Sequence, residues 1–329
     1  NGERRMAVEQ EKTRMTQGPV GRILLRFALP LFLGNLFQQL YNTADSLVVG
    51  NFSGNEALAA VSSSGSLCFL LIGFFQGVFT GASVVISRRY GAQDAEGVDR
   101  AIHATVIFSL AAGLLLTVLG VAFTPTILRW IGTPENVMPD SVLYFRIYCS
   151  GLLGLVLYNT ANGIFQALGD SRHPLCYLIV SSLVNVVLDL LFVAVLDMGV
   201  GGAALATVIG QCLSALLGFR YLMSGRFLVR VSLRPFRADP AVMGLIFRLG
   251  LPSGVQNSVI AIANVVVQSR INAFGDNAMA GCGSYFKVEG FVFLPITCLT
   301  LAMTTFVSQN LGAQQYDRVR QGARLGTLM

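Results

Sequence analysis

Charge is scarce in this sequence: charged residues make up only 12% of its 329 residues, while 53% are apolar. It has two histidines, and its six cysteines include no close pair with the spacing of a metal or redox motif. The Gly-x-Ser-x-Gly, His-Glu-x-x-His and Walker sequences that mark hydrolases, zinc peptidases and ATPases are absent. We therefore expect that the protein is not an enzyme and holds no bound cofactor.

The apolar residues are gathered into long runs separated by short charged stretches. Most of the runs reach the roughly 20 residues that a helix needs to cross about 30 Å of hydrocarbon. This pattern predicts an all-α fold, a polytopic transmembrane helical bundle. The expected helices span residues 26–49, 57–87, 99–123, 141–168, 174–196, 200–222, 246–272 and 279–308. Residues 1–20 lack the apolar core of a cleavable signal peptide, so we expect the first helix to be retained.

Basic residues are divided unequally between the two ends of these helices. The N-terminal tail and the second, fourth, sixth and eighth connections carry most of them, whereas the other side has only Arg129 and Arg270. Because cytoplasmic loops carry an excess of Lys and Arg, this predicts a multi-pass protein of the inner (cytoplasmic) membrane with a cytoplasmic N-terminus. The net charge of +6 then reflects topology. Membrane lipid, and not nucleic acid, is the expected partner.

Two parts of the chain, 222 residues apart, resemble each other. Pro30 matches Pro252 and Asn42 matches Asn264; after a slip of one residue, the loop 91–93 (Gly-Ala-Gln) matches 312–314. A repeat on membrane-length helices is typical of a duplicated transport module. The expected organisation is a cytoplasmic tail (1–22), a six-helix lobe (23–223), an inter-lobe linker (224–243) and the start of a second lobe (244–329).

Three carboxylates, Asp45, Asp189 and Glu289, lie well inside the expected helices. An ionisable group at such a depth is a candidate for function, because burying it in lipid is costly. Asp45 and Asp189 come within about 7 and 12 Å of the outer helix ends. Asn185 lies one turn before Asp189, and Thr207 reaches a similar depth on the next helix.

Two acids at one level cannot both stay ionised in a low dielectric without a cation. We therefore expect the four residues to form a site for a coupling cation, either Na⁺ or a proton. The alternative is that each polar group merely forms a hydrogen bond with a neighbouring helix.

Further polar and aromatic side chains form stripes along several helices. We interpret these stripes as the lining of a watery substrate cavity, with hydrogen bonds between helices as the alternative. The expected cavity residues are Gln38, Tyr41, Asn42, Gln76, Tyr158, Asn159, Asn162, Gln166, Gln211 and Glu289. The aromatic members suit apolar, aromatic or cationic solutes. Pro30 interrupts the first helix and is expected to act as a hinge or as a static kink.

An ordered set of motifs resembles the multidrug and toxic compound extrusion (MATE) family. The set consists of Leu29-Pro30, Asn42-Thr43-Ala44-Asp45, Tyr90-Gly91-Ala92-Gln93, Gly169-Asp170, Asn185-x-x-x-Asp189 and Gly202-Ala203-Ala204-x-Ala206-Thr207. The resemblance implies a prokaryotic exporter of twelve helices, monomeric when full length. It implies two six-helix lobes that export organic, often cationic, drug-like small molecules in exchange for Na⁺ or H⁺. It also implies cation binding by Asp45, Asn185, Asp189 and Thr207, and a bend at Pro30.

The sequence departs from this pattern in several places. Val267 stands where the repeat would place a second Asp45, so we expect no second cation site there. Lys287 and Glu289, two residues apart, point to nearly opposite faces of one helix, and either could enter the cavity. With about eight helices, the chain looks like a C-terminally truncated member with an incomplete second lobe. A flippase of lipid-linked sugars from the same superfamily and a non-transporting membrane scaffold are the alternative functions.

Overall fold

The computed structural model describes residues 15–52, 75–130, 138–224, 239–272 and 276–329, and within these ranges every regular element is a helix. The elements are α2 (Val20–Phe52), α4 (Ala95–Trp130), α5 (Met138–Ser150), α6 (Leu152–Ala167), α7 (Arg172–Asp189), η1 (Leu190–Val195), α8 (Gly199–Met223), α9 (Pro240–Asn272), α10 (Asp276–Gly312) and α11 (Tyr316–Leu328). A further helix covers 75–91 between α2 and α4. In the described residues, six helices are long and apolar enough to cross a membrane, or seven if the bent pair α5 and α6 is one span. The structure thus confirms an all-α, multi-pass membrane fold.

The expected helix at 141–168 is wrong as a continuous element, because α5 and α6 meet at an angle of 49°. The break falls at Gly151, whose backbone N–H donates to Tyr148 O at 3.0 Å. A Cβ added to Gly151 would lie 2.3 Å from a methyl group of Val208 on α8. Because Gly151 has no side chain, Val208 of α8 can pack directly against the bend. Any other residue at this position would clash with Val208.

Two other expected helices differ from the structure in detail. The one at 174–196 changes from α-helix to a π-helical turn, η1, directly after Asp189. The first half of the one at 57–87 lies outside the described residues. The helix α9 begins at Pro240, inside the segment expected to be a linker. Pro30 lies inside α2, which continues as a helix on both sides of it.

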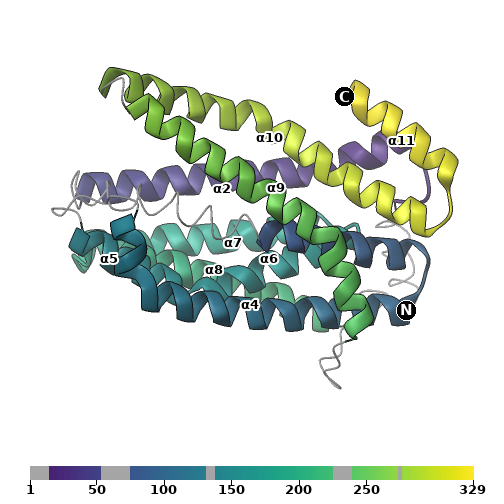
Figure 1. The fold of residues 1–329 in the computed structure, drawn as a ribbon, viewed down its shortest axis with the longest axis horizontal. Helices are drawn as coiled ribbons and strands as arrows, with labels where there is room; N and C mark the ends of the chain where they lie inside the picture. Colours follow the sequence, from purple (N-terminus) through teal and green to yellow (C-terminus); the bar gives the residue numbers. More distant parts are fainter. Residues whose placement is uncertain (1–14, 53–74, 131–137, 225–238, 273–275) are drawn as a thin grey trace.

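The helices form two groups with α2 between them (Figure 1). α4 to α8 make one bundle, and α10 and α11 lie on the other side of α2, which contacts both α7 and α10. α9 runs diagonally from α10 across to α4. The bundle core joins α4, α6 and helix 75–91 around Ile102, Ile164 and Phe165. A separate apolar cluster ties α2 to α10 through Phe27, Leu31 and Phe306. Apolar side chains of α9 and α10 such as Val259 and Ile296 are exposed, as expected of helices that face lipid.

Helix 75–91 also crosses α9 at very short range. Gly77 and Gly81 face Gly250 and Gly254, and a Cβ on Gly77 would lie 2.1 Å from the backbone nitrogen of Gly254. Pairs of glycines four residues apart on both helices allow their backbones to touch, which is a common mode of helix packing in membranes. Helix 75–91 thus belongs to the bundle through α4 and α6 and also holds α9 against it.

Candidate functional site

Three of the four residues expected to bind a cation, Asn185, Asp189 and Thr207, lie where α7 packs against α8. Asn185 and Asp189 are one turn apart on α7, and both are buried, with exposed fractions of 3% and 1%. Thr207 reaches the same place from α8 and is 9% exposed. Gly210 lies opposite Asn185, and a Cβ there would be only 3.3 Å from the Cβ of Asn185. The glycine therefore sets the close packing of the two helices at this site.

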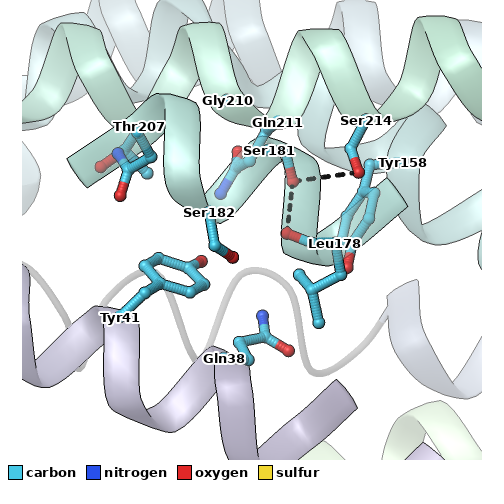
Figure 2. A pocket seen from close by; sticks show the side chains of 11 residues that line it. Gln38, Tyr41, Tyr158, Leu178, Ser181, Ser182, Thr207, Gly210, Gln211 and Ser214 are labelled. Atoms are coloured by element: carbon cyan, nitrogen blue, oxygen red, sulfur yellow. Dashed lines mark hydrogen bonds between the residues drawn. The ribbon is translucent and has the colours of Figure 1, made fainter. Parts of the chain in front are cut away.

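Of the hydroxyl groups around the site, those of Ser181 and Thr207 have protein acceptors. Ser181 Oγ donates to Leu178 O at 3.0 Å and lies 3.3 Å from Ser214 Oγ, and Figure 2 shows both interactions. Thr207 Oγ1 donates to Ala203 O of its own helix at 3.1 Å. Asn185 differs, because neither polar atom of its buried amide has a hydrogen-bond partner in the described part of the chain. A buried amide of this kind is costly unless a ligand, ion or water satisfies it.

A small cavity of about 20 Å³ opens beside Asn185 and Thr207. This volume holds one water molecule or one small ion. Its other lining residues are Gln38, Tyr41, Tyr158, Leu178, Ser181, Ser182, Gly210, Gln211 and Ser214. In Figure 2, Gln38 and Tyr41 extend from α2 toward the cavity-lining side chains of α7 and α8. Asp45 lies one helical turn beyond Tyr41 along α2, but its side chain lies outside the described residues.

A larger cavity, of about 330 Å³, lies between the bundle and α10. Of the residues expected to line a substrate cavity, it contains Gln38, Gln76, Tyr158, Asn159, Asn162 and Gln166. Pro30 also lines it, whereas Tyr41 and Gln211 line only the small cavity. Asn42 is exposed on α2 and Glu289 is half-buried on α10, and neither lines these two cavities. The polar stripes of separate helices thus meet around one space.

The two cavities share part of their lining. Gln38, Tyr158 and Leu178 contribute to both, so a single layer of side chains separates the small cavity from the large one. An ion that binds in the small cavity would therefore contact side chains that also contact a molecule in the large cavity.

Some residues that line the cavities were not predicted from the sequence, although the sequence contains a signal for several of them. Ser181 lies one turn before Asn185 on the same face of α7, and this spacing was a usable signal. Thr304 on α10 lines the large cavity at the position that matches Ser83 in the repeat, and Ser83 lines it too. The repeat could have identified this pair. The π-helical turn after Asp189 has no signal in the sequence, although such turns are frequent at functional sites.

The donor set suits a hard cation such as Na⁺. In the described residues no three His, Cys, Asp or Glu side chains gather in a way that could hold a transition metal. The groups that line the small cavity carry amide and hydroxyl oxygens, and the buried carboxylate of Asp189 lies one turn along α7 from Asn185. Oxygen atoms of these types are the ligands that hard cations prefer. Na⁺ or a proton at this place would be cargo of the protein and not a resident cofactor.

A multi-pass helical membrane fold with two polar cavities inside it is typical of membrane transporters. Comparison with known proteins then gives the family: the MatE family model matches residues 30–191 and 252–329, and the chain belongs to this family. The probable multidrug resistance protein YoeA of Bacillus subtilis is 34% identical over 97% of this chain and 70% of its own length. The FAD transporter of Shewanella oneidensis is 25% identical over 96% of this chain and 71% of its own length. The chain is therefore a transporter and not an enzyme.

Solved structures of the family show the same fold. A multidrug resistance MATE family transporter of the MOP superfamily in an outward-facing conformation is 28% identical, with a TM-score of 0.89 over 95% of this chain and 70% of that one. A MATE protein in the bent conformation has a TM-score of 0.88 at 28% identity over 96% of this chain and 70% of that one. The fold and family expected from the sequence motifs are thus confirmed.

Proposed function

We propose that this protein is a secondary active efflux transporter that exchanges Na⁺ or H⁺ for small organic molecules, many of them cationic. The observation that carries the proposal is the shared lining of the two cavities through Gln38, Tyr158 and Leu178. An antiporter requires that its ion and its substrate influence each other, and shared side chains supply a direct route for this coupling. The names of related proteins, which include multidrug resistance proteins and a FAD transporter, agree with organic substrates.

Asp189 and Asn185 are the residues that we propose to hold the ion, together with Thr207 and Asp45. A buried carboxylate is stabilised when it binds a cation or takes up a proton, since burial disfavours the uncompensated charge. Loss of the ion would restore negative charge next to the shared lining, whereas binding would neutralise it. The ion and a substrate in the large cavity can thus bias the same side chains in opposite directions.

Phe79 and Tyr158 give the large cavity the aromatic character that a multidrug substrate site needs. Aromatic rings bind flat apolar molecules by stacking, and they attract organic cations through the ring quadrupole. The cavity volume of about 330 Å³ is also within the size of sites for small molecules.

We further propose that the protein lies in the cytoplasmic membrane with its N-terminus inside. The basic residues at the end that carries the Gly-Ala-Gln loops support this orientation. In a background without native cysteines, a cysteine near Ser232 should react with an impermeant thiol reagent only from the cytoplasm. One near Asn55 should react only from outside, and reversed labelling would contradict the orientation.

The exchange itself is tested by Asp189→Asn, with Asp197→Asn as the matched control because Asp197 is exposed in the turn after η1. Membrane vesicles containing each variant are loaded with ethidium, and its movement is followed under an imposed Na⁺ or H⁺ gradient. We expect Asp189→Asn to abolish gradient-driven movement and Asp197→Asn to retain it. Transport at the wild-type rate by correctly inserted Asp189→Asn would refute the ion site, and no transport by the wild-type protein would favour a scaffold role.

A further inference from the structure

The lining of the large cavity is polar without being charged. In the described part of the chain, its lining contains amides, hydroxyls, aromatic rings and aliphatic side chains, but no Lys, Arg, Asp or Glu. Three of the amides belong to glutamines on three different helices: Gln38 on α2, Gln76 on helix 75–91 and Gln166 on α6. The cavity is thus built to exchange hydrogen bonds and not to pair charges.

The asparagines of this cavity are already engaged by the protein. Asn35 Nδ2 donates to Cys298 Sγ at 3.2 Å, Asn159 Nδ2 donates to Leu155 O at 2.9 Å, and Asn162 forms a hydrogen bond with Tyr158. The hydroxyls of Thr80, Thr297 and Thr304 are satisfied by their own helices. No hydrogen bond joins the side chains of Gln38, Gln76 or Gln166 to the described residues, so these three amides are available to a ligand.

Resting on the proposed transport function, we propose that the protein recognises its substrates through an uncharged edge that both donates and accepts hydrogen bonds. Imides, lactams and primary carboxamides on a flat ring have such an edge. A glutamine amide offers two N–H donors and a carbonyl acceptor, and therefore complements an alternating donor and acceptor edge without a net charge. Phe79 and Tyr158 supply the stacking surface for the ring.

Sites of this kind discriminate strongly against analogues that lack the edge. When the hydrogen-bonding edge of the ligand is blocked, the amides of the cavity are left without a partner. The affinity for the ligand then falls by more than it would after the loss of an apolar contact. A cation without such an edge would keep only the aromatic contribution. The proposal therefore ranks ligands by their hydrogen-bonding edge ahead of their charge.

The test measures binding to the purified protein in detergent by fluorescence quenching. The probes are riboflavin, which has an imide N–H; 3-methylriboflavin, in which that N–H is blocked; and ethidium, a flat cation. We expect riboflavin to bind at least about tenfold more tightly than its methylated form, the factor that corresponds to one hydrogen bond of ordinary strength. Gln166→Leu should remove most of this difference, while the exposed Gln321→Leu on α11 should leave it intact.

Equal binding of the two flavins by the wild-type protein would overturn the proposal, as would tighter binding of ethidium than of riboflavin. The proposed function is judged separately, by gradient-driven ethidium movement and its loss in Asp189→Asn. If the protein transports ethidium but binds both flavins equally, the proposed hydrogen-bonding edge is wrong and the proposed antiport function still stands.

A second inference rests on a different part of the molecule, the two Gly-Ala-Gln loops of the repeat. A Cβ on Gly91 would lie 1.9 Å from Gln309 O, and a Cβ on Gly312 would lie 1.9 Å from Arg88 O. Gly91 matches Gly312 in the repeat, and Arg88 matches Gln309. The contact is thus reciprocal between the two repeats, and we call these four residues the loop crossing.

Buried hydrogen bonds tie the loop crossing to both lobes. Gln309 is fully buried; its Oε1 accepts from Met15 N at 3.0 Å, and its Nε2 donates to Ala167 O at 2.9 Å. Ser87 Oγ donates to the same Ala167 carbonyl at 3.1 Å. The end of α6 therefore receives one donor from each repeat.

The loop crossing lies directly beyond one end of the large cavity. Ser83 and Thr304 line that cavity, Ser87 and Gln309 lie about one turn further along the same two helices, and Gly91 and Gly312 end them. Backbone contact leaves no passage between the helices at this point. We propose that the loop crossing is the gate at this end of the transport path and that Gln309 holds it closed.

Alternating access requires such a gate to separate when the lobes rock. The test replaces Thr304 by cysteine in a protein without its native cysteines and measures the labelling rate by an impermeant thiol reagent applied from the loop side. We expect Gln309→Met to raise this rate by about tenfold, since it removes a side chain with two buried hydrogen bonds. The same substitution at exposed Gln321 is the control.

If Gln309→Met fails to fold, Ser87→Ala is the milder variant, because Gln309 still donates to Ala167 O. We expect Ser87→Ala to raise labelling from the loop side by a smaller factor. Unchanged labelling in a folded variant would overturn the gate, and so would labelling that rises equally from both sides.

Discussion

The two Gly-Ala-Gln loops have the same backbone but different surroundings. Gln93 and Gln314 both have φ of 59°, and their backbone N–H groups donate three residues back, to Tyr90 O at 3.1 Å and to Leu311 O at 3.2 Å. The repeat therefore preserves the loop conformation itself. The two copies differ in the residues near each loop, among them Arg88-Arg89 in the first copy and Gln309-Asn310 in the second.

The arginine pair is exposed, whereas Gln309 and Asn310 are both buried. Arg89 and Asp94 form an ion pair at 2.8 Å, with side chains 46% and 37% exposed. Asn310 is fully buried, and its Oδ1 accepts from Arg318 Nε at 3.1 Å while its Nδ2 donates to Met15 O at 3.2 Å. Neutral amides can be buried when all their hydrogen bonds are made, whereas a pair of arginines stays in water.

The largest effect is expected where the two loops touch. Gly91→Ala or Gly312→Ala places a Cβ 1.9 Å from a carbonyl oxygen, so the backbones must separate. We expect the free energy of unfolding to fall by about 3 kcal/mol or more, as for overpacking that rigid neighbours cannot relieve. Thermal unfolding in detergent, followed by circular dichroism, measures it. Gly244→Ala is the control, because nothing lies within 4 Å of its added Cβ.

The next effect separates the buried residue pair, Gln309-Asn310, from the exposed pair, Arg88-Arg89. Asn310→Leu removes one of the hydrogen-bond partners of Met15 O and one of those of the Arg318 guanidinium, while the bond from Arg318 to Met15 O remains. Burial lowers the pKa of Arg318. We expect a loss of about 2 to 3 kcal/mol in the free energy of unfolding, because buried polar groups lose hydrogen bonds. Arg89→Leu at the matching position breaks only an exposed ion pair and should cost less than about 1 kcal/mol. Equal losses at the two positions would contradict the distinction between the exposed and the buried residue pair.

A smaller effect is expected from a substitution that gives the second copy the helix cap of the first. Asp94 caps α4 by accepting from Gly97 N at 2.9 Å, whereas the matching residue, Gln315, makes no such bond at the start of α11. We expect Gln315→Asp to raise the free energy of unfolding by about 1 kcal/mol by adding the cap. Asp94→Ala should lower it by a similar amount. A rise in melting temperature for Gln315→Asp checks this, with Gln321→Asp inside α11 as the control.

The smallest effect concerns pH. The hydrogen bond from Gly97 N and the nearby Arg89 hold the pKa of Asp94 below its ordinary value of 3.8, although partial burial opposes them. Because its pKa is lower in the folded state, Asp94 stabilises the protein fully above about pH 4 to 5, and this contribution is lost as the pH falls through the lowered pKa. Since its side chain is partly exposed, the contribution is small. Unfolding curves of Asp94→Asn and the wild-type protein should therefore converge on acidification.

Much of the fold could be predicted from the sequence, because membrane helices need about 20 apolar residues and polar breaks between them. The apolar runs predicted the all-α membrane fold and the order of its helices, and the motifs predicted the family. The bend at Gly151 and the π-helical turn after Asp189 did not, because they depend on how closely α8 approaches α6 and on the local winding of α7. Residues one turn apart, such as Asn185 and Asp189, could be grouped because helical spacing places them on one face.

The sequence by itself determined which polar residues lie inside membrane helices and which loops repeat. Only the tertiary structure decided that Gln38 and Tyr158 belong to both cavities, and that Gln309 reaches from α10 to Met15 and Ala167. Local patterns report periodicity along one helix, while the partner of a buried amide depends on side chains far apart in the chain. The contact between Gly91 and Gln309 is of this second kind, because a repeat in the sequence does not say that its two copies touch.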